Sequence, residues 1–430
     1  MAVSGRFVVL ALLGLIPVAL LPGWGSAALV GLLLLAAVLL DLALAVPLRQ
    51  VSVQRNDAGS VPLAGQAESV LTVANAGRRM LRGLVRDAWQ PSAGARNPVQ
   101  PLLVPPGERR RVTVTLQPTR RGELAAAHVT VRAFGPLGLA ARQRTFPCPG
   151  TLRVLPPFHS RRHLPSKLRQ LRELDGKAAV QIRGAGTEFD SLRDYVRGDD
   201  VRSIDWRATA RRSAVVVRTW RPERDRRVVI LLDTSRTAAA RIADEPRLDT
   251  GIEAALLLAV LAERGGDRVD FLAFDRRLRA QAGSAAKGNL LGQLVQAMVP
   301  LEAELIELDW PQIPARVRSV SAHRSLVVLL TALDGGAPEE GLLPMAAQLA
   351  QQHVVVVASV RDPQLGEMQR ERSTATGVFR AAAAERALLE REAVSAQLRH
   401  AGVEVVDAEP AQLPPALADA YIRLKAAGRL

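Results

Sequence analysis

Apolar residues dominate the first 46 positions of the chain, in two runs that are separated by a turn. The first run, FVVLALLGLIPVALL, covers positions 7–21, and the second, AALVGLLLLAAVLLDLALAV, covers positions 27–46. The second run has the roughly 20 residues that a helix needs to cross a bilayer. Proline, glycine and tryptophan between the runs favour a turn. The pattern therefore predicts a transmembrane helical hairpin over residues 1–48.

Basic residues flank the predicted hairpin, with Arg6 before it and Arg49 and Arg55 after it. The positive-inside rule then places both termini and the following domains in the cytoplasm, at the inner (cytoplasmic) membrane. A cleaved signal peptide is the alternative for the first run, and the second run would still return the chain to the cytoplasmic side. Asp41 is costly in hydrocarbon, so we expect it at the membrane interface, near the end of the second span.

Short alternating segments replace the apolar runs from residue 49 to residue 155. Three of them, ESVLTVANAG (68–77), RRVTVTLQP (110–118) and AHVTVRAFGPLG (127–138), each run from a strand pattern into a turn signal. Alternation of apolar and polar residues with period two is typical of half-buried strands. We therefore predict a small β-sandwich domain that serves binding or spacing, because nothing in it has catalytic spacing.

Continuous apolar strands alternate with helical stretches from residue 225 to residue 430. The strand patterns are RRVVILLD (226–233), DRVDFLAFD (267–275), HRSLVVLLTALD (323–334), HVVVVASV (353–360) and GVEVVDA (402–408). This alternation predicts a doubly wound α/β domain, with sites at the carboxyl ends of its strands. Residues 156–224 form a linker and a separate charged segment between the two predicted domains.

The composition narrows the classes of function. The chain has 430 residues, of which 48% are hydrophobic, so it can form two cores in addition to membrane helices. Aromatic residues make up only 3%, which argues against binding of carbohydrate or single-stranded nucleic acid by stacking. The single cysteine, Cys148, excludes an intramolecular disulfide.

The formal charge of +15 makes a charge-driven binder of nucleic acid or of an anionic surface one hypothesis. The arginines are scattered among acidic residues and form no long stripe, so binding of nucleic acid is the weaker interpretation. The densest basic run, HSRRHLPSKLRQLR at 159–172, could rest on an anionic membrane surface or form a solvated linker.

LLDTSRT at positions 231–237 is the candidate chemical motif of the α/β domain. An apolar strand ends at Asp233, and hydroxyl side chains follow at Ser235 and Thr237. One carboxylate and alternate hydroxyls on a tight loop are oxygen ligands that suit a hard divalent cation such as Mg²⁺. The alternative is that Asp233 caps the following helix while Ser235 and Thr237 satisfy the loop backbone.

Enzymatic interpretations have less support in the sequence. A P-loop and a nucleophile elbow are absent, and Ser235 has no evident histidine partner, because His323 and His353 precede strands. An aspartyl nucleophile at Asp233 would need a second aspartate two residues on, where the chain has Ser235. We therefore expect no catalytic residues, and we keep a membrane-tethered metal-dependent hydrolase that uses Asp233 as the alternative.

A longer segment upstream of this motif carries a family resemblance. GTEFDSLRDYVRGDDVRSIDWRATARR at 186–212, followed by AVVVRTW and VVILLDTSRT, resembles the bacterial DUF58 family of unknown function. PTRRGEL (118–124), FGPLGL (134–139) and the predicted hairpin extend the resemblance over almost the whole chain. The resemblance implies a von Willebrand factor A-like α/β domain. It also implies an accessory or adaptor role, without enzymatic activity, beside a MoxR-type AAA+ ATPase and a protein client in remodelling or maturation of protein complexes.

The signature segment mixes charges of both signs with two large aromatic residues. It could brace the α/β domain or present a polar docking face with aromatic anchors, and we favour the brace, with both aromatic residues half buried. Its candidate residues are Arg193, Tyr195, Asp199, Asp200, Arg202, Asp205 and Trp206.

The resemblance to von Willebrand factor A domains implies a metal-ion-dependent adhesion site at Asp233, Ser235 and Thr237. Two further ligands of such a site are displaced. Ala332 stands where the third loop usually has an acid, which is delayed to Asp334, and Glu307 stands near the place of a threonine. We therefore predict a degenerate site that holds Mg²⁺ weakly, or only when a partner adds an acidic side chain. The polar carboxyl edge could bind protein without a cation.

Overall fold

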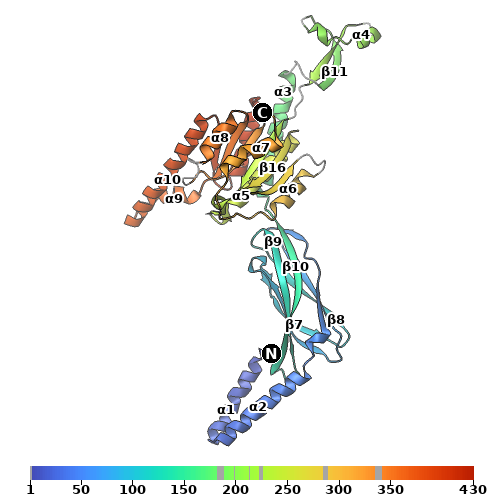
Figure 1. Ribbon diagram of the computed structural model, residues 1–430, viewed down its shortest axis with the longest axis vertical. Helices are drawn as coiled ribbons and strands as arrows, with labels where there is room; N and C mark the ends of the chain where they lie inside the picture. Colours follow the sequence, from blue (N-terminus) through green and yellow to red (C-terminus); the bar gives the residue numbers. More distant parts are fainter. Residues whose placement is uncertain are drawn as a thin grey trace. The chain divides into compact units, whose positions relative to one another are not determined.

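The computed structural model describes residues 2–181, 188–197, 199–212, 214–221, 226–283, 289–334 and 341–430 (Figure 1). The chain divides into two compact units, Met1–Pro157 and Phe158–Leu430. The first unit contains two apolar helices and two β-sheets, and the second contains a mixed six-stranded sheet with helices on both faces. The chain is therefore multidomain, as its sequence predicts.

Two apolar helices open the first unit: α1 (Gly5–Leu20) and α2 (Trp24–Leu44). They lie side by side in Figure 1. Among the described residues, one apolar segment, Trp24–Gln50, is long enough to cross a membrane. The 16-residue α1 falls short of that length. The structure thus supports a single helix of membrane-spanning length.

Asp41, near the end of α2, is fully buried against a turn of the β domain. Its carboxylate accepts hydrogen bonds from the backbone N–H groups of Leu137 (2.8 Å), Leu139 (2.7 Å) and Ala140 (2.9 Å). A Cβ on Gly135 would lie 2.1 Å from the Asp41 carboxylate, so only glycine fits there. The FGPLGL sequence therefore forms a turn that offsets the desolvation of this carboxylate.

Two sheets form the rest of the first unit, with antiparallel pairing throughout except that β3 pairs parallel with β10. One has the order β1-β10-β9-β5-β7 with β3 beside β10, and the other has the order β2-β4-β8-β6. Leu71 and Val73 of β4 share a core with Val129 and Val131 of β9, so side chains of both sheets pack together. The bounds are β1 (Ala2–Val3), β2 (Val51–Arg55), β3 (Ser60–Pro62), β4 (Ala67–Asn75), β5 (Leu81–Trp89), β6 (Ala95–Arg96), β7 (Val99–Val104), β8 (Arg109–Leu116), β9 (Gly122–Phe134) and β10 (Ala140–Leu155).

The second unit is built around a sheet of order β17-β16-β13-β18-β19-β20. All neighbouring strands in it are parallel except β17, which pairs antiparallel with β16. The chain order reverses between β13 and β18, which makes the gap beyond their carboxyl ends the topological switch point. The bounds are β13 (Arg227–Asp233), β16 (Arg268–Phe274), β17 (Leu278–Gly283), β18 (Leu326–Leu330), β19 (Val354–Val360) and β20 (Glu404–Ala408).

Helices cover both faces of this sheet, because its strands are apolar on both sides. Ile230 and Leu232 of β13 pack with α5, α6 and α11, whereas Val229 and Leu231 pack with α7, α8 and α10. The helices are α3 (Leu164–Gln181), α5 (Arg247–Arg264), α6 (Leu290–Met298), α7 (Ile313–Val320), α8 (Leu343–Ala350), α9 (Pro363–Arg370), α10 (Ala375–His400) and α11 (Leu413–Ala426). The two-residue strands β14 (Arg241–Ile242) and β15 (Glu245–Pro246) pair before α5.

The signature segment forms a small element of its own. β11 (Glu188–Asp194) pairs antiparallel with β12 (Val216–Arg221), and the short helix α4 (Trp206–Arg212) lies between them in sequence. The first residues of the quoted signature, 186 and 187, lie outside the described residues.

Candidate functional site

Asp233 is the last residue of β13, beside the switch point of the sheet. The side chain is nearly buried, and both carboxylate oxygens accept hydrogen bonds. Oδ1 accepts from the backbone N–H of Ser235 (2.7 Å), and Oδ2 accepts from the hydroxyl of Thr237 (2.9 Å). The Ser235 and Thr237 hydroxyl oxygens are 3.2 Å apart. The structure thus brings together the three residues of the predicted motif.

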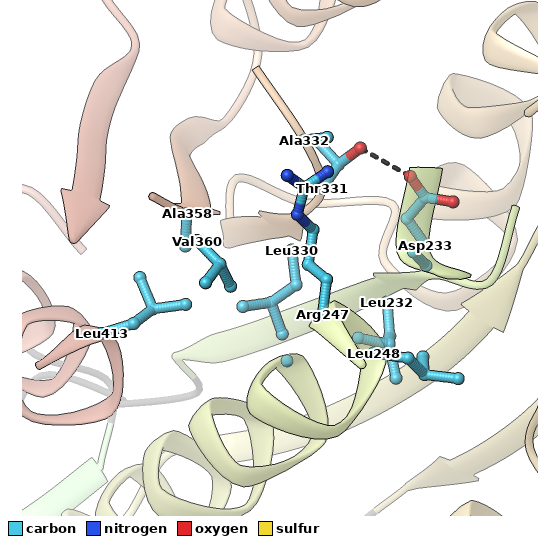
Figure 2. A pocket seen from close by; sticks show the side chains of 12 residues that line it. Leu232, Asp233, Arg247, Leu248, Leu330, Thr331, Ala332, Ala358, Val360 and Leu413 are labelled. Carbon is cyan, nitrogen blue, oxygen red and sulfur yellow. Dashed lines mark hydrogen bonds between the residues drawn. The ribbon is translucent and has the colours of Figure 1, made fainter. Parts of the chain in front are cut away.

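Thr331 is a fourth member of this cluster that the sequence analysis missed. It follows β18 directly, and its hydroxyl donates a 2.7 Å hydrogen bond to Oδ2 of Asp233, drawn as a dashed line in Figure 2. In the sequence analysis the adjacent Ala332 was considered instead, because an acid was expected at that position. The sequence signal that could have identified Thr331 is a hydroxyl residue directly after β18, the strand that pairs with β13.

The acidic side chains of the neighbouring loops form ion pairs of their own. Asp275, just beyond β16, accepts hydrogen bonds from the Thr234 hydroxyl (3.1 Å) and from the Arg279 guanidinium. Burial raises the pKa of Asp275, but the hydrogen bonds from Arg279, the Arg277 backbone and Thr234 outweigh it and hold that pKa below its usual value. Glu307, expected near the second loop, pairs with Arg236 at the surface.

Asp334 lies between two arginines. One carboxylate oxygen pairs with Arg247 at the start of α5, and the other pairs with Arg391 of α10. This predicted metal ligand is therefore engaged by guanidinium groups, and the structure gives it no hydrogen bond in common with Asp233 among the described residues. Neither arginine was singled out from the sequence.

Arg247 and Arg391 are held by further groups at the carboxyl edge. Arg391 donates to Asp407 (2.5 Å) and to the hydroxyl of Ser359 (3.1 Å). Arg247 donates to the carbonyl oxygen of Thr237 (3.1 Å), on the Asp233 loop. Burial lowers the pKa of Arg247, and the nearby charges of Asp233, Asp362 and Asp407 oppose that effect.

A small recess of about 20 Å³ opens beside Asp233. Arg247 runs along it toward the loop that carries Thr331 and Ala332 (Figure 2). Most of the lining of the recess is apolar, so its few polar groups determine which ligand groups can bind there. It is lined by Leu232, Asp233, Ala238, Arg247, Leu248, Gly251, Leu330, Thr331, Ala332, Ala358, Val360 and Leu413.

These residues do not form a complete Mg²⁺ site. In the part of the chain that the structure describes, no three His, Cys, Asp or Glu side chains are grouped so that they could hold a metal ion. Asp233 is the carboxylate of its cluster, and three donors already bind its oxygens. Mg²⁺ requires near-ideal octahedral oxygen coordination, and with Asp334 held by arginines the donor set does not fit a tight site.

Charged residues of the signature segment mainly brace the segment itself. Arg193 forms a two-pronged ion pair with Asp199 at 2.6 and 2.8 Å. Asp205 accepts from the backbone N–H groups of residues 207 and 208, both at 3.0 Å, and pairs with Arg218 at 2.8 Å. The Arg193 hydrogen bond lowers the pKa of Asp199, and the N–H of Ala208 and the Arg218 pair lower that of Asp205. Asp200 accepts from the backbone N–H of Arg202 (2.9 Å).

The two aromatic residues of the signature differ in exposure. Tyr195 is partly buried, and its backbone N–H donates to the carbonyl of Val215 (2.8 Å). Trp206 begins α4 and is 67% exposed. The expectation that both rings are half buried is wrong for Trp206, because α4 leaves its indole open to solvent.

His323 and His353 lie at the opposite edge of the sheet from Ser235. His353 immediately precedes β19 and lies 3.0 Å from the hydroxyl of Ser325, which precedes β18. His323 precedes β18 as well. Both residues thus lie at the amino edge of the parallel strands, whereas Ser235 lies at the carboxyl edge.

The second unit is therefore a doubly wound α/β domain with a polar cluster at its switch point. Residues 191–372 match the model of the family described as "Protein of unknown function DUF58". This confirms the family resemblance of the sequence.

Similar curated proteins are uncharacterized. Uncharacterized protein Rv1480 of Mycobacterium tuberculosis is 27% identical over 194 residues, which are 44% of this chain and 60% of that protein. Uncharacterized protein YeaD of Bacillus subtilis is 28% identical over 133 residues, 30% of this chain and 33% of that protein. The match thus spans about 60% of the length of the mycobacterial relative.

A solved structure similar to part of this chain is the CARDB domain of the PF1109 protein from Pyrococcus furiosus, in complex with di-metal ions. It is 16% identical and covers 24% of this chain and 89% of that chain, with a TM-score of 0.18. So low a score does not establish a shared fold.

Proposed function

We propose that the protein is a membrane-anchored, protein-binding adaptor that works with a MoxR-type AAA+ ATPase in remodelling or maturation of protein complexes. One observation carries the proposal. Asp233 and its hydroxyl neighbours form a polar cluster beside an apolar recess at the switch point, where α/β sheets bind ligands. Such a surface suits recognition of a partner side chain.

The architecture of the second unit supports a von Willebrand factor A-like domain within this proposal. Its strands have the order of a doubly wound sheet, with one antiparallel edge strand. The Asp233, Ser235 and Thr237 cluster lies at the corresponding carboxyl edge. Mg²⁺ enters the proposal only as weakly or partner-dependently bound, since Asp334 is held by arginines.

The N-terminal helices provide the membrane anchor in this proposal. α2 has the length to span the inner membrane, and α1 would form the first arm of a hairpin. Arg6 and Arg49 flank the pair, which favours both termini and the globular units in the cytoplasm. A reporter fused after Leu430 should then be active only in the cytoplasm.

Capture of partners from native cells tests the adaptor proposal. The full chain, tagged and extracted in detergent, should enrich an AAA+ ATPase, and Asp233→Ala should reduce that enrichment about tenfold through loss of a polar contact at the site. Glu390→Ala, which alters an exposed ion pair on α10, is the matched control and should leave capture unchanged.

Other outcomes of the same capture experiment point elsewhere. Recovery of nucleic acid alone, lost steeply with added salt, would favour the charge-driven binder. An ATPase captured equally by the wild type and by Asp233→Ala would remove the Asp233 cluster from the binding surface.

A further inference from the structure

The two arginines that bind Asp334 come from opposite faces of the second unit's sheet. Arg247 belongs to α5, which packs on one face, and Arg391 belongs to α10, which packs on the other. Their guanidinium groups meet over the carboxyl edge, with the Asp334 carboxylate between them. We call Arg247 and Arg391 the arginine clamp.

Burial differs sharply between the clamp and its carboxylate. The side chains of Arg247 and Arg391 are 8% and 5% exposed, whereas that of Asp334 is 42% exposed. The cations thus form the floor of the site. Oδ1 of Asp334 is buried toward them, and the rest of its side chain is open to solvent. A carboxylate in that position can leave without unfolding a core.

The clamp keeps its geometry through contacts that do not involve Asp334. Asp407 and Ser359 hold Arg391, and the carbonyl oxygen of Thr237 holds Arg247. The buried Nε of Arg247 has no hydrogen-bond partner among the described residues. This nitrogen is an unused donor in a side chain that is more than nine-tenths buried, next to the Asp233 recess.

We propose that the arginine clamp is a metal-independent binding site for a carboxylate, occupied within the chain by Asp334 and available to an aspartate or glutamate side chain of a protein partner. Paired guanidinium groups bind carboxylates through short, charge-assisted hydrogen bonds. Exchange of one carboxylate for another conserves charge, so neither buried arginine is left uncompensated. This inference rests on the proposed function, and it names the chemistry of the partner's contact.

The clamp also accounts for the poor fit of the site to Mg²⁺. In an adhesion site of the metal-dependent kind, a cation links the protein to a partner's acid. Here two fixed guanidinium groups supply positive charge at the same edge of the sheet. Partner binding through the clamp should therefore persist in the presence of a chelator.

Chemical rescue with acetate tests carboxylate binding by the full chain in detergent. Asp334→Ala opens the clamp, so sodium acetate should raise its unfolding temperature by about 2 to 4 °C over sodium chloride of equal ionic strength. The wild type should show no such difference, and neither should Glu390→Ala, whose carboxylate pairs with exposed Arg386. Adding Arg247→Gln to Asp334→Ala should abolish the acetate effect. Equal unfolding temperatures of Asp334→Ala in both salts would overturn the proposal.

A glutamate-rich probe tests access by a protein side chain and does not depend on the stability of Asp334→Ala. With EDTA present, fluorescent poly-L-glutamate should bind full-length Asp334→Asn about tenfold more tightly than wild type, because the competing carboxylate is gone. Arg247→Gln should remove that gain. Equal binding by Asp334→Asn and wild type, or binding that requires Mg²⁺, would contradict the inference.

The two proposals fail separately in these experiments. Loss of acetate rescue and of glutamate binding, with ATPase capture intact, would reject the clamp and leave the adaptor function standing. Carboxylate binding without capture of any ATPase would reject the adaptor function alone.

Discussion

Each unit of this protein contains a buried arginine paired with an aspartate, and the two arrangements differ in how far the aspartate is enclosed. In the first unit, Arg55 and Asp87 form a two-pronged ion pair at 2.7 and 2.9 Å, with side chains only 2% and 1% exposed. In the second unit, Asp334 meets its two arginines from the solvent side. The same chemistry thus makes a closed structural pair in one place and an open carboxylate site in the other.

The closed pair joins the two sheets of the first unit. Arg55 lies on β2 of one sheet, and Asp87 lies on β5 of the other. Ser69 (2.9 Å) and the indole N–H of Trp89 (3.0 Å) donate to the same Asp87 oxygen, so the carboxylate is fully satisfied. No exchange with an external acid is possible there without opening the sandwich.

Removal of the closed carboxylate should give the largest effect. Asp87→Ala leaves Arg55 buried and unpaired, which should lower the free energy of unfolding of the first unit by about 3 to 5 kcal/mol. Urea dependence of hydrogen exchange on β4 and β9 in the full chain measures this loss. Glu123→Ala, which removes the exposed pair with Arg153, is the control and should change stability by less than about 1 kcal/mol.

Removal of the open carboxylate should have a smaller effect. Asp334→Ala should lower the unfolding free energy of the second unit by about 1 to 2 kcal/mol, because water screens the exposed carboxylate. Asp407 still pairs with Arg391, and the charges of Asp233, Asp362 and Asp407 still act on Arg247. Hydrogen exchange on β18 and β19 reports the change. A loss of unfolding free energy as large as that of Asp87→Ala would mean that Asp334 is a structural member of the core. The distinction between closed and open pairs would then be wrong.

The sequence predicts the sheets of both units better than it predicts these ion pairs. Apolar runs locate β13, β16, β18 and β19, because strands buried on both faces need continuous hydrophobic residues, and a shorter apolar run locates the partly buried edge strand β20. β17 escapes this signal, since its sequence LRAQAG is mixed at the edge of the sheet. A local sequence pattern therefore predicts a strand well where the strand is uniformly buried.

Long-range pairing limits what the sequence reveals about the site. The spacing of Asp233, Ser235 and Thr237 is local, so their cluster could be predicted from one loop. Arg247 and Arg391 are far apart in the chain, and each stands in an ordinary helical context. Only the packing of α5 and α10 on opposite faces of the sheet, with Arg247 and Arg391 at its carboxyl edge, brings them to Asp334, and no sequence period encodes that contact.

A third prediction concerns the Asp233 cluster. It contains no ion pair, and it is less enclosed than the Arg55–Asp87 pair. Thr331→Val removes one hydroxyl donor from Asp233 and should lower the unfolding free energy of the second unit by about 1 kcal/mol. Thr130→Val alters an exposed threonine pair in the β domain and should be nearly neutral. Urea unfolding of the full chain, followed by hydrogen exchange in each unit, compares the two. A neutral Thr331→Val would show that water replaces this hydroxyl, and Asp233 would then belong with the open sites.

The smallest predicted effect concerns His353. This residue is a neutral buried group at the amino edge of the sheet, in contrast to the charged groups at the carboxyl edge. His353 is largely buried beside the Ser325 hydroxyl, and burial lowers its pKa from the ordinary value of 6.5. The unfolded chain therefore binds a proton at His353 more readily than the folded chain, so stability is fully present above pH 6.5 and is lost as pH falls through the folded pKa. His353→Gln should lose less stability than the wild type between about pH 7.5 and pH 5.5, a range that spans the ordinary histidine pKa. Hydrogen exchange on β19 at the two pH values measures the difference, and equal losses in both proteins would show that His353 is protonated in the fold as easily as in the unfolded chain.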